Sequence, residues 1–154
     1  MRYADIQKCE ISNGTGIGMS LFLQGCHFHC KDCFNPETWD YKGGKEWTEE
    51  TEKKFLKLIQ RPYIKRVTFL GGEPLDQPDE IANLMRKIRE LKPEIKIWLY
   101  SGYKFEDIFL EDFECLKYVD VLVDGQFESD KKDLSLAFRG SSNQRIIRFK
   151  EQQK

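Results

Sequence analysis

The stretch "KRVTFLGGEPLDQP" (residues 65–78) joins a strand, a tight turn and the start of a helix. Apolar and β-branched residues lead into a double glycine, which predicts a buried strand over 65–72. Pro78 suits the first turn of a helix. A stripe expected to be buried follows it at helical spacing, formed by Ile81, Leu84, Met85, Ile88 and Leu91. A strand that leads directly into a helix is the building unit of an α/β fold.

The same alternation extends in both directions along the chain. Thr48 is a plausible N-cap for a helix that ends before Pro62. Further strands are expected at 19–25, 94–102 and 118–126, with a short helix at 104–109 and a last strand at 144–149. The pattern predicts a single domain over residues 1–154 with a parallel α/β sheet, open or barrelled.

Parallel sheets bind ligands at the carboxyl ends of their strands. In this chain those ends carry four unusual segments, which are a cysteine-rich loop, "GGEP" (71–74), "YSG" (100–102) and "VDGQ" (123–126). We therefore expect the four segments to meet at one rim of the sheet.

Composition narrows the class of protein. The formal net charge of −1 gives no reason to expect nucleic acid or a membrane surface as a partner. No apolar run approaches the length of a membrane span, and the N-terminus "MRYADIQKCE" has no apolar signal region. Five cysteines, three of them clustered, are not a disulfide framework and fit a reducing compartment, so we expect a cytoplasmic protein.

The cysteine-rich loop "GCHFHCKDC" (25–33) places Cys26, Cys30 and Cys33 at C-x3-C-x2-C spacing. Closely spaced thiolates bind soft metals or iron–sulfur clusters. Three cysteines on a 4Fe–4S cluster would leave one iron open to an outside ligand. The alternative is zinc with His27 or His29 as a fourth ligand, because structural zinc sites have four protein ligands. Cys9 and Cys115 lie outside the spacing and are expected to be small buried side chains.

The cysteine spacing after the first strand, together with "GGEP" after a later one, resembles the radical S-adenosylmethionine enzymes. The resemblance implies a partial, open (β/α) barrel and a 4Fe–4S cluster on the three clustered cysteines. It also implies that S-adenosylmethionine chelates the open iron, with its amino group met by Gly71, Gly72 and Glu73. The family often has an aromatic residue before the third cysteine, where this chain has Asp32. Phe28 or Phe34 is then the candidate to pack on the adenine.

Two later strand ends supply further candidate contacts for the cofactor. Ser101 is placed to bond a ribose hydroxyl or the methionine carboxylate, or to serve as an ordinary turn residue. Asp124 contacts the ligand or caps a helix. Asp120, beside it, is expected on the polar face of its strand. The segment "RGSSNQR" (139–145) holds a carboxylate or a partner loop, or is a capped polar turn.

No ligand-binding site is expected in two other segments. "NGTGIG" (13–18) has no strand before it and no helix after it, which argues against a dinucleotide site. The terminal "RFKEQQK" is expected to be a solvated tail.

Within the radical family, nearly the whole chain resembles the activating proteins of anaerobic ribonucleotide reductases. The specific parts are "CKDCFNPETW" (30–39) and "RGSSNQR" (139–145), and Arg148 departs from an often acidic position. The resemblance implies that the reduced cluster gives one electron to S-adenosylmethionine. The resulting 5′-deoxyadenosyl radical then takes a hydrogen from a glycine of the anaerobic ribonucleoside-triphosphate reductase, with a flavodoxin-type electron donor.

Three alternatives stay open at this point. They are a radical enzyme for a small molecule, an activase for another glycyl-radical enzyme, and a non-catalytic zinc-binding adaptor.

Overall fold

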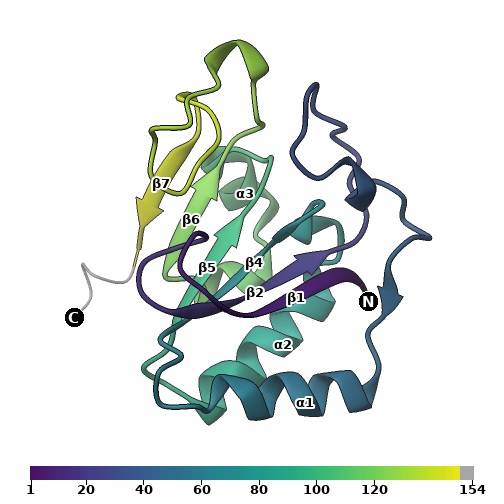
Figure 1. The fold of residues 1–154 in the computed structure, drawn as a ribbon, viewed down its shortest axis with the longest axis vertical. Helices are drawn as coiled ribbons and strands as arrows, with labels where there is room; N and C mark the ends of the chain where they lie inside the picture. Colours follow the sequence, from purple (N-terminus) through teal and green to yellow (C-terminus); the bar gives the residue numbers. More distant parts are fainter. Residues whose placement is uncertain (150–154) are drawn as a thin grey trace.

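Seven strands form one mixed sheet in the computed structural model, which describes residues 1–149 (Figure 1). The sheet order is β3-β1-β2-β4-β5-β6-β7. The strands are β1 (Arg2–Glu10), β2 (Gly18–Leu23), β3 (Lys45–Glu46), β4 (Arg66–Gly71), β5 (Lys96–Tyr100), β6 (Val121–Asp124) and β7 (Arg145–Arg148). The helices are α1 (Glu49–Ile59), α2 (Pro78–Leu91) and α3 (Phe105–Glu111), with short 3-10 turns η1 (Pro36–Thr38), η2 (Pro74–Asp76), η3 (Glu114–Tyr118) and η4 (Ser129–Lys131).

The centre of the sheet is parallel and its edges are antiparallel. Strands β2, β4, β5 and β6 pair in parallel, and α1, α2 and α3 occupy the connections between them. The predicted α/β class with parallel strands is therefore confirmed. The sheet ends in β3 on one side and β7 on the other, so it is open and a barrel is not confirmed. Sequence analysis missed β1 and β3, because the first has a single buried residue and lacks an apolar run and the second has two residues.

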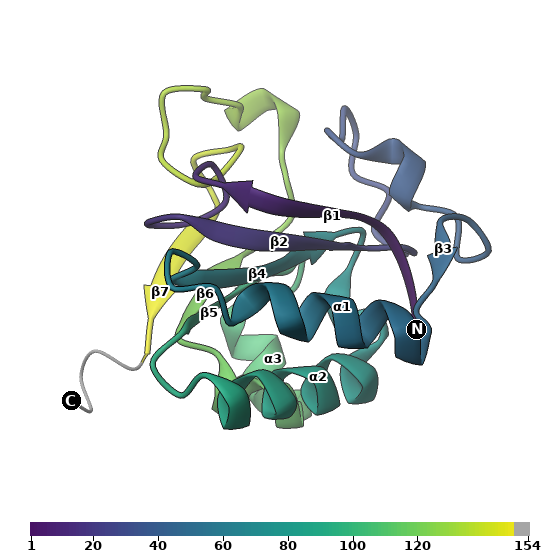
Figure 2. The same ribbon diagram turned by 60° about the horizontal axis from the view of Figure 1, so that its bottom comes forward.

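The three helices cover one face of the sheet (Figure 2). Val67 and Phe69 of β4 belong to the same buried core as the predicted α2 stripe, of which Ile81, Leu84, Met85 and Ile88 are buried. Leu91 was expected in that stripe but is 48% exposed, because it is the last residue of the helix. Thr48 caps α1 as predicted, since its hydroxyl accepts a hydrogen bond from the Thr51 amide at 3.1 Å.

The opposite face carries a second, smaller cluster, built on Trp98, Val121 and Val123. The β1–β2 loop (residues 11–17) closes this face at one end through Arg66, whose side chain is fully buried. The Arg66 guanidinium donates to the Glu10 carboxylate at 2.7 Å and to the Thr15 carbonyl at 3.3 Å. The segment "NGTGIG" thus packs on this face. The expectation that no strand precedes it is wrong, because β1 ends at Glu10, but β2 follows it and not a helix, as expected.

Three further expectations about single side chains are wrong. Asp120 is buried, because it accepts hydrogen bonds from Arg89 at 2.8 Å and from the Ile97 amide at 2.9 Å. Cys9 is exposed, whereas Cys115 is buried as expected. Phe149, assigned to the solvated tail, packs on Phe105 with ring centroids 5.3 Å apart. The rest of that predicted tail, residues 150–154, lies outside the described residues. None of the helices within 1–149 is long and apolar enough to cross a membrane.

Candidate iron–sulfur and cofactor site

The cysteine loop leaves the carboxyl end of β2 and is fixed by backbone hydrogen bonds. The Gly25 amide donates to the Thr38 carbonyl at 2.6 Å, and the Glu73 amide donates to the Gly25 carbonyl at 2.8 Å. His29 and Asp32 have positive φ angles of 48° and 59°. Aspartate tolerates this left-handed conformation because its short side chain bonds locally. The unusual Asp32 therefore suits the tight path of the loop.

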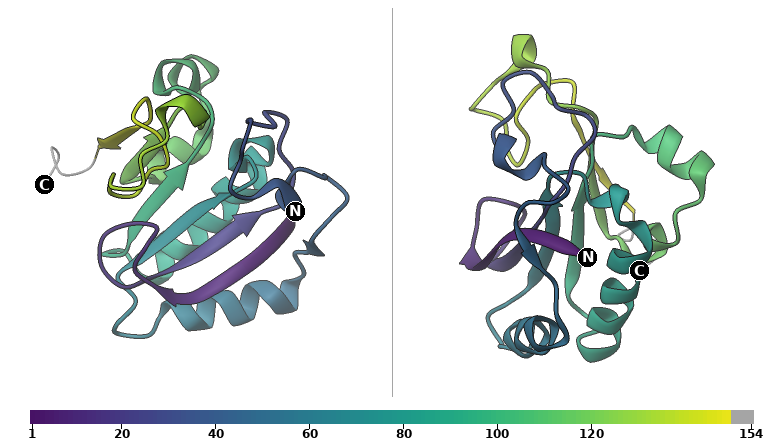
Figure 3. Two further views of the ribbon diagram at one scale, coloured as in Figure 1. Left: turned by 45° about the horizontal axis from the view of Figure 1, so that its top comes forward. Right: turned by 90° about the vertical axis from the view of Figure 1, so that its right-hand side faces the viewer.

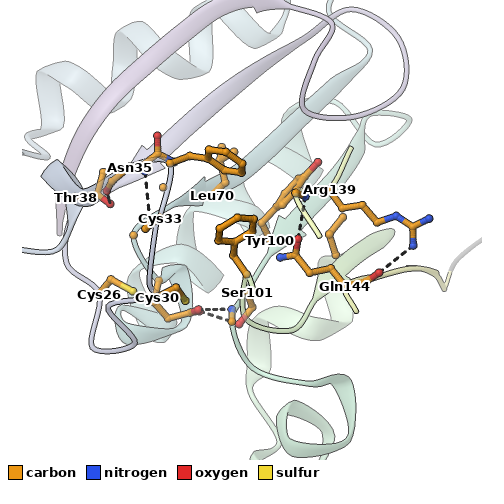
Figure 4. Close-up of a pocket in the computed structure, with 18 of the residues that line it drawn as sticks. Cys26, Cys30, Cys33, Asn35, Thr38, Leu70, Tyr100, Ser101, Arg139 and Gln144 are labelled. Atoms are coloured by element: carbon orange, nitrogen blue, oxygen red, sulfur yellow. Dashed lines mark hydrogen bonds between the residues drawn. The ribbon is translucent and has the colours of Figure 1, made fainter. Parts of the chain in front are cut away.

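The predicted segments meet in one cleft of about 470 Å³ (Figure 4). The cysteine loop and the β6–β7 loop (residues 125–144) both project from the same end of the sheet and flank it (Figure 3). Figure 4 places the three cysteines toward one end, with Arg139 and Gln144 at the other. Of the predicted site residues, the lining includes Cys26, Cys30, Cys33, Gly71, Gly72, Glu73 and Ser101.

The Cys26 and Cys30 thiols favour the protonated form when no metal is bound. Burial raises the pKa of Cys26, although the backbone amides of Phe28 and His29 face its sulfur and act in the opposite direction. Burial likewise raises the pKa of Cys30, against a hydrogen bond from the Phe127 amide. Amide donors aimed at sulfur are the surroundings that iron–sulfur clusters use to set their potential. The donor set therefore fits a cluster held by three cysteines.

Glu73 connects two strand ends at the back of the cleft. Its side chain is buried, and its carboxylate accepts hydrogen bonds from Ser101 Oγ at 2.9 Å, the Gly102 amide at 2.6 Å and the Leu75 amide at 2.9 Å. Burial raises the pKa of Glu73 to about 7, although these three bonds favour the ionised form. Ser101 is thereby oriented by Glu73, and both residues line the cleft.

Gly71 and Gly72 allow the turn after β4 to lie against the cysteine loop. Gly71 has a φ of +116°, which only glycine adopts without strain. A Cβ on Gly72 would lie 2.3 Å from the Gly25 carbonyl oxygen. The two glycines therefore bring the "GGEP" turn next to Cys26, which follows Gly25 directly.

Asp124 is the predicted site residue that the structure does not bring into this cleft. Its buried carboxylate pairs with the Arg145 guanidinium and accepts a hydrogen bond from the Phe105 amide at 2.8 Å. The second contact caps the start of α3, which is the alternative weighed for this residue. Asp124 lines a separate hollow beside α3.

Both candidate aromatic residues line the cleft, in different environments. Phe28 is half-buried against Tyr103, with ring centroids 5.1 Å apart, and touches Gly102, where an added Cβ would lie 2.6 Å from its ring. Phe34 is 53% exposed and packs on Phe127 at 4.8 Å. Phe28 is thus fixed beside the strand ends, whereas Phe34 lies at the mouth.

The two histidines of the loop are engaged away from the sulfur atoms. His27 Nδ1 lies 2.8 Å from the Asp76 carboxylate, and the His29 ring stacks on Trp39 with centroids 4.5 Å apart. Among residues 1–149, no three His, Cys, Asp or Glu side chains are arranged to hold a single ion. In this structure the two rings are thus occupied by Asp76 and Trp39.

Tyr100 and Gln126 lie in predicted rim segments but were given no contact there, whereas Asn13 was not expected to line the cleft. Tyr100 donates to the Phe138 carbonyl at 2.6 Å and ties the β6–β7 loop to the sheet. Gln126 accepts a weak hydrogen bond from the Cys30 thiol at 3.8 Å. Asn13 reaches the cleft from the β1–β2 loop, because its carbonyl accepts a bond from Thr68 at 2.8 Å. A polar threonine in a buried strand was the available signal for that loop.

The segment "RGSSNQR" folds largely on itself. Arg139 lines the cleft and donates to the Gln144 carbonyl at 2.9 Å, while its Nε is buried without a partner among the described residues. Ser141 is buried, and its amide donates to the Gln144 side chain at 3.1 Å. The capped turn considered for this segment is therefore present, and Arg139 is the residue of this turn that lines the cleft together with Gly140 and Gln144.

Comparison with known proteins agrees with this chemistry. A family model described as "4Fe-4S single cluster domain" matches residues 12–147. The anaerobic ribonucleoside-triphosphate reductase-activating protein of Enterobacteria phage T4 is 40% identical over 148 residues, which cover 95% of this chain and 93% of the relative. The proteins of the same name from Pasteurella multocida and Escherichia coli K12 are 36% and 35% identical, over 97% and 94% of this chain and 98% and 96% of the relatives.

The α/β sheet and its cysteine-lined cleft thus define a protein with a single 4Fe–4S cluster domain. The near full-length similarity narrows this class. The chain belongs to the family of anaerobic ribonucleoside-triphosphate reductase-activating proteins.

Proposed function

We propose that this protein is a radical S-adenosylmethionine activase that generates a glycyl radical on an anaerobic ribonucleotide reductase. One observation carries the proposal. Cys26, Cys30 and Cys33 line the same cleft as Glu73 and Ser101, so a cluster and a small cofactor would share it. Three cysteine ligands leave one iron of a 4Fe–4S cluster open to that cofactor.

A bound and reduced cluster would supply the one electron needed to cleave S-adenosylmethionine into methionine and a 5′-deoxyadenosyl radical, which would take a hydrogen atom from the target glycine. The three cysteines hold the cluster. Because burial raises the pKa of Cys26 and Cys30, loading the metal releases their protons. Glu73 and the backbone of Gly71 and Gly72 would bind the amino group of the cofactor.

The remaining walls of the cleft exclude water and orient the cofactor. Ser101, fixed by its bond to Glu73, would bind a ribose hydroxyl or the carboxylate. Phe28 is our candidate to pack on the adenine, because it is anchored between Gly102 and Tyr103. Asp124 would act through Arg145 and the start of α3.

The target is proposed to be a protein loop, because an open sheet does not enclose the cleft as a closed barrel would. The names of the relatives supply the partner, an anaerobic ribonucleoside-triphosphate reductase. A flavodoxin-type protein is the proposed electron donor. All five cysteines are free, which accords with the reducing cytoplasm as the place of action.

The test mixes reduced, cluster-loaded protein with S-adenosylmethionine and the anaerobic reductase. A glycyl-radical doublet should appear in the spin-resonance spectrum of the reductase and should require Cys26, Cys30 and Cys33. The activase proposal would be wrong if no radical formed on the reductase and the protein turned over a small organic compound without a protein partner. The protein would then be an enzyme for a small molecule.

A further inference from the structure

The Asp76 carboxylate ties the cysteine loop to the turn that follows "GGEP". His27 Nδ1 lies 2.8 Å from its Oδ1, and the His27 amide donates to Oδ2 at 3.3 Å. The Tyr41 hydroxyl donates to the same Oδ2 at 2.7 Å. Asp76 belongs to η2, and its side chain is only 13% exposed. One carboxylate therefore joins three segments that are far apart in the sequence.

These bonds fix the residue that follows the first cysteine. Because Asp76 holds both the amide and the ring of His27, it fixes the orientation of the peptide between Cys26 and His27. The next two amides, of Phe28 and His29, are the ones that face the Cys26 sulfur. A rotation of this turn would carry both donors away from the sulfur.

We propose that Asp76 is a positioning residue for the iron–sulfur cluster, acting through His27 on the amide donors to the Cys26 sulfur. The inference rests on the cluster site of the proposed function. Partners of metal ligands beyond the first shell set ligand orientation, and hydrogen bonds to sulfur help set the potential. Amide dipoles stabilise the more negative, reduced cluster, so their loss lowers its potential.

The test compares Asp76→Ala with Asp79→Ala, which removes an exposed carboxylate from the first turn of α2. Both variants are reconstituted anaerobically, without S-adenosylmethionine or reductase. Asp76→Ala should release iron to a chelator about 10- to 100-fold faster than the native protein. Its midpoint potential should be more negative and its reduced-state spin-resonance spectrum altered. Asp79→Ala should match the native protein in all three measurements.

His27→Ala should reproduce these changes. The double variant with Asp76→Ala should show the same iron release, potential and spectrum as either single variant, because both act through one contact. If Asp76→Ala does not fold, His27→Ala and Tyr41→Phe each remove one partner and carry the same test. Native iron release, potential and spectrum in a folded Asp76→Ala would overturn the inference and leave the proposed function standing. A native chain that holds no cluster would overturn both.

Discussion

The Ser101 hydroxyl donates to the Glu73 carboxylate at 2.9 Å, and this bond joins the ends of β4 and β5 behind the cleft. The neighbouring Gly102 amide binds the same carboxylate at 2.6 Å. Two of the segments that the resemblance assigns to S-adenosylmethionine are thus held as one unit. A change at Glu73 acts on both of them.

Replacing Glu73 by alanine should weaken binding of S-adenosylmethionine at pH 8 and leave the cluster in place. A hydrogen bond to a charged group contributes about 1.5–3 kcal/mol, which corresponds to a loss of affinity of about tenfold to a hundredfold. Calorimetry on the cluster-loaded protein measures the affinity for S-adenosylmethionine. Glu80→Ala, on the exposed part of α2, is the matched control. Equal affinities in the two variants would remove Glu73 from the site.

The stability of the metal-free protein should fall as the pH rises from about 5 to 8. Burial raises the pKa of Glu73 from 4.5 to about 7, so the folded chain holds this proton more tightly than the unfolded chain. The resulting stabilisation is complete below the unfolded pKa and is lost as the pH rises through 7, a change of about 3 kcal/mol. Denaturant unfolding of the native protein and of Glu73→Gln measures the difference. The same pH dependence in both would contradict the prediction.

Single alanine variants of Cys26, Cys30 and Cys33 should each lose the cluster. Each removes one of the three thiols that line the cleft. Iron and sulfide analysis after anaerobic reconstitution gives the result. Cys9→Ala is the matched control, because Cys9 is exposed and does not line the cleft. Full iron loading of Cys30→Ala would show that this cysteine is not a ligand.

Gly102→Ala should displace Phe28 and weaken binding of S-adenosylmethionine with little effect on the cluster. The added Cβ would lie 2.6 Å from the Phe28 ring, so the ring must move. A smaller side chain in Phe28→Leu should relieve the contact, so the double variant should fold as stably as Phe28→Leu alone. Calorimetry and thermal unfolding test both statements. Native affinity in Gly102→Ala would mean that the position of this ring does not matter for the cofactor.

Arg145→Ala should lower the free energy of unfolding and leave the affinity for S-adenosylmethionine unchanged. It removes the cation beside the buried Asp124 carboxylate, which also caps α3. Since the Arg145 side chain is 48% exposed and water replaces part of the contact, we expect a cost of about 1–2 kcal/mol. Arg86→Ala, which removes a similarly exposed arginine that pairs only with surface side chains of α2, is the control. If Arg145→Ala lost affinity for S-adenosylmethionine and kept native stability, Asp124 would again be a candidate contact of the cofactor.

Local patterns in the sequence were sufficient to predict the centre of the fold. The β4 strand, the helix after Pro78 and the cap at Thr48 each follow from the chemistry of neighbouring residues. The edges were not predictable in this way. β1 has a single buried residue, and it is defined by pairing with β2 and β3. Pairing depends on residues that are distant in the sequence, which periodicity does not report.

The same distinction applies to the cleft. The cysteine spacing and "GGEP" carry their chemistry in consecutive residues, and the structure brings them together. Asp124 could be read as a ligand contact or as a cap from its position alone, because its partner Arg145 is 21 residues away. The contact between His27 and Asp76 spans 49 residues and has no local signal.

The buried Arg66 holds the 11–17 loop against the sheet face that carries the cleft, and Asn13 of this loop lines the cleft. A loop fixed in this way limits the routes by which a ligand can enter and leave. Under the proposed function, the small cofactor has to enter before the reductase docks. The docked reductase would then block exchange between the cleft and the solvent. Activation would be an ordered reaction with one radical delivered per encounter, because spent nucleoside and methionine leave only after the reductase has moved away.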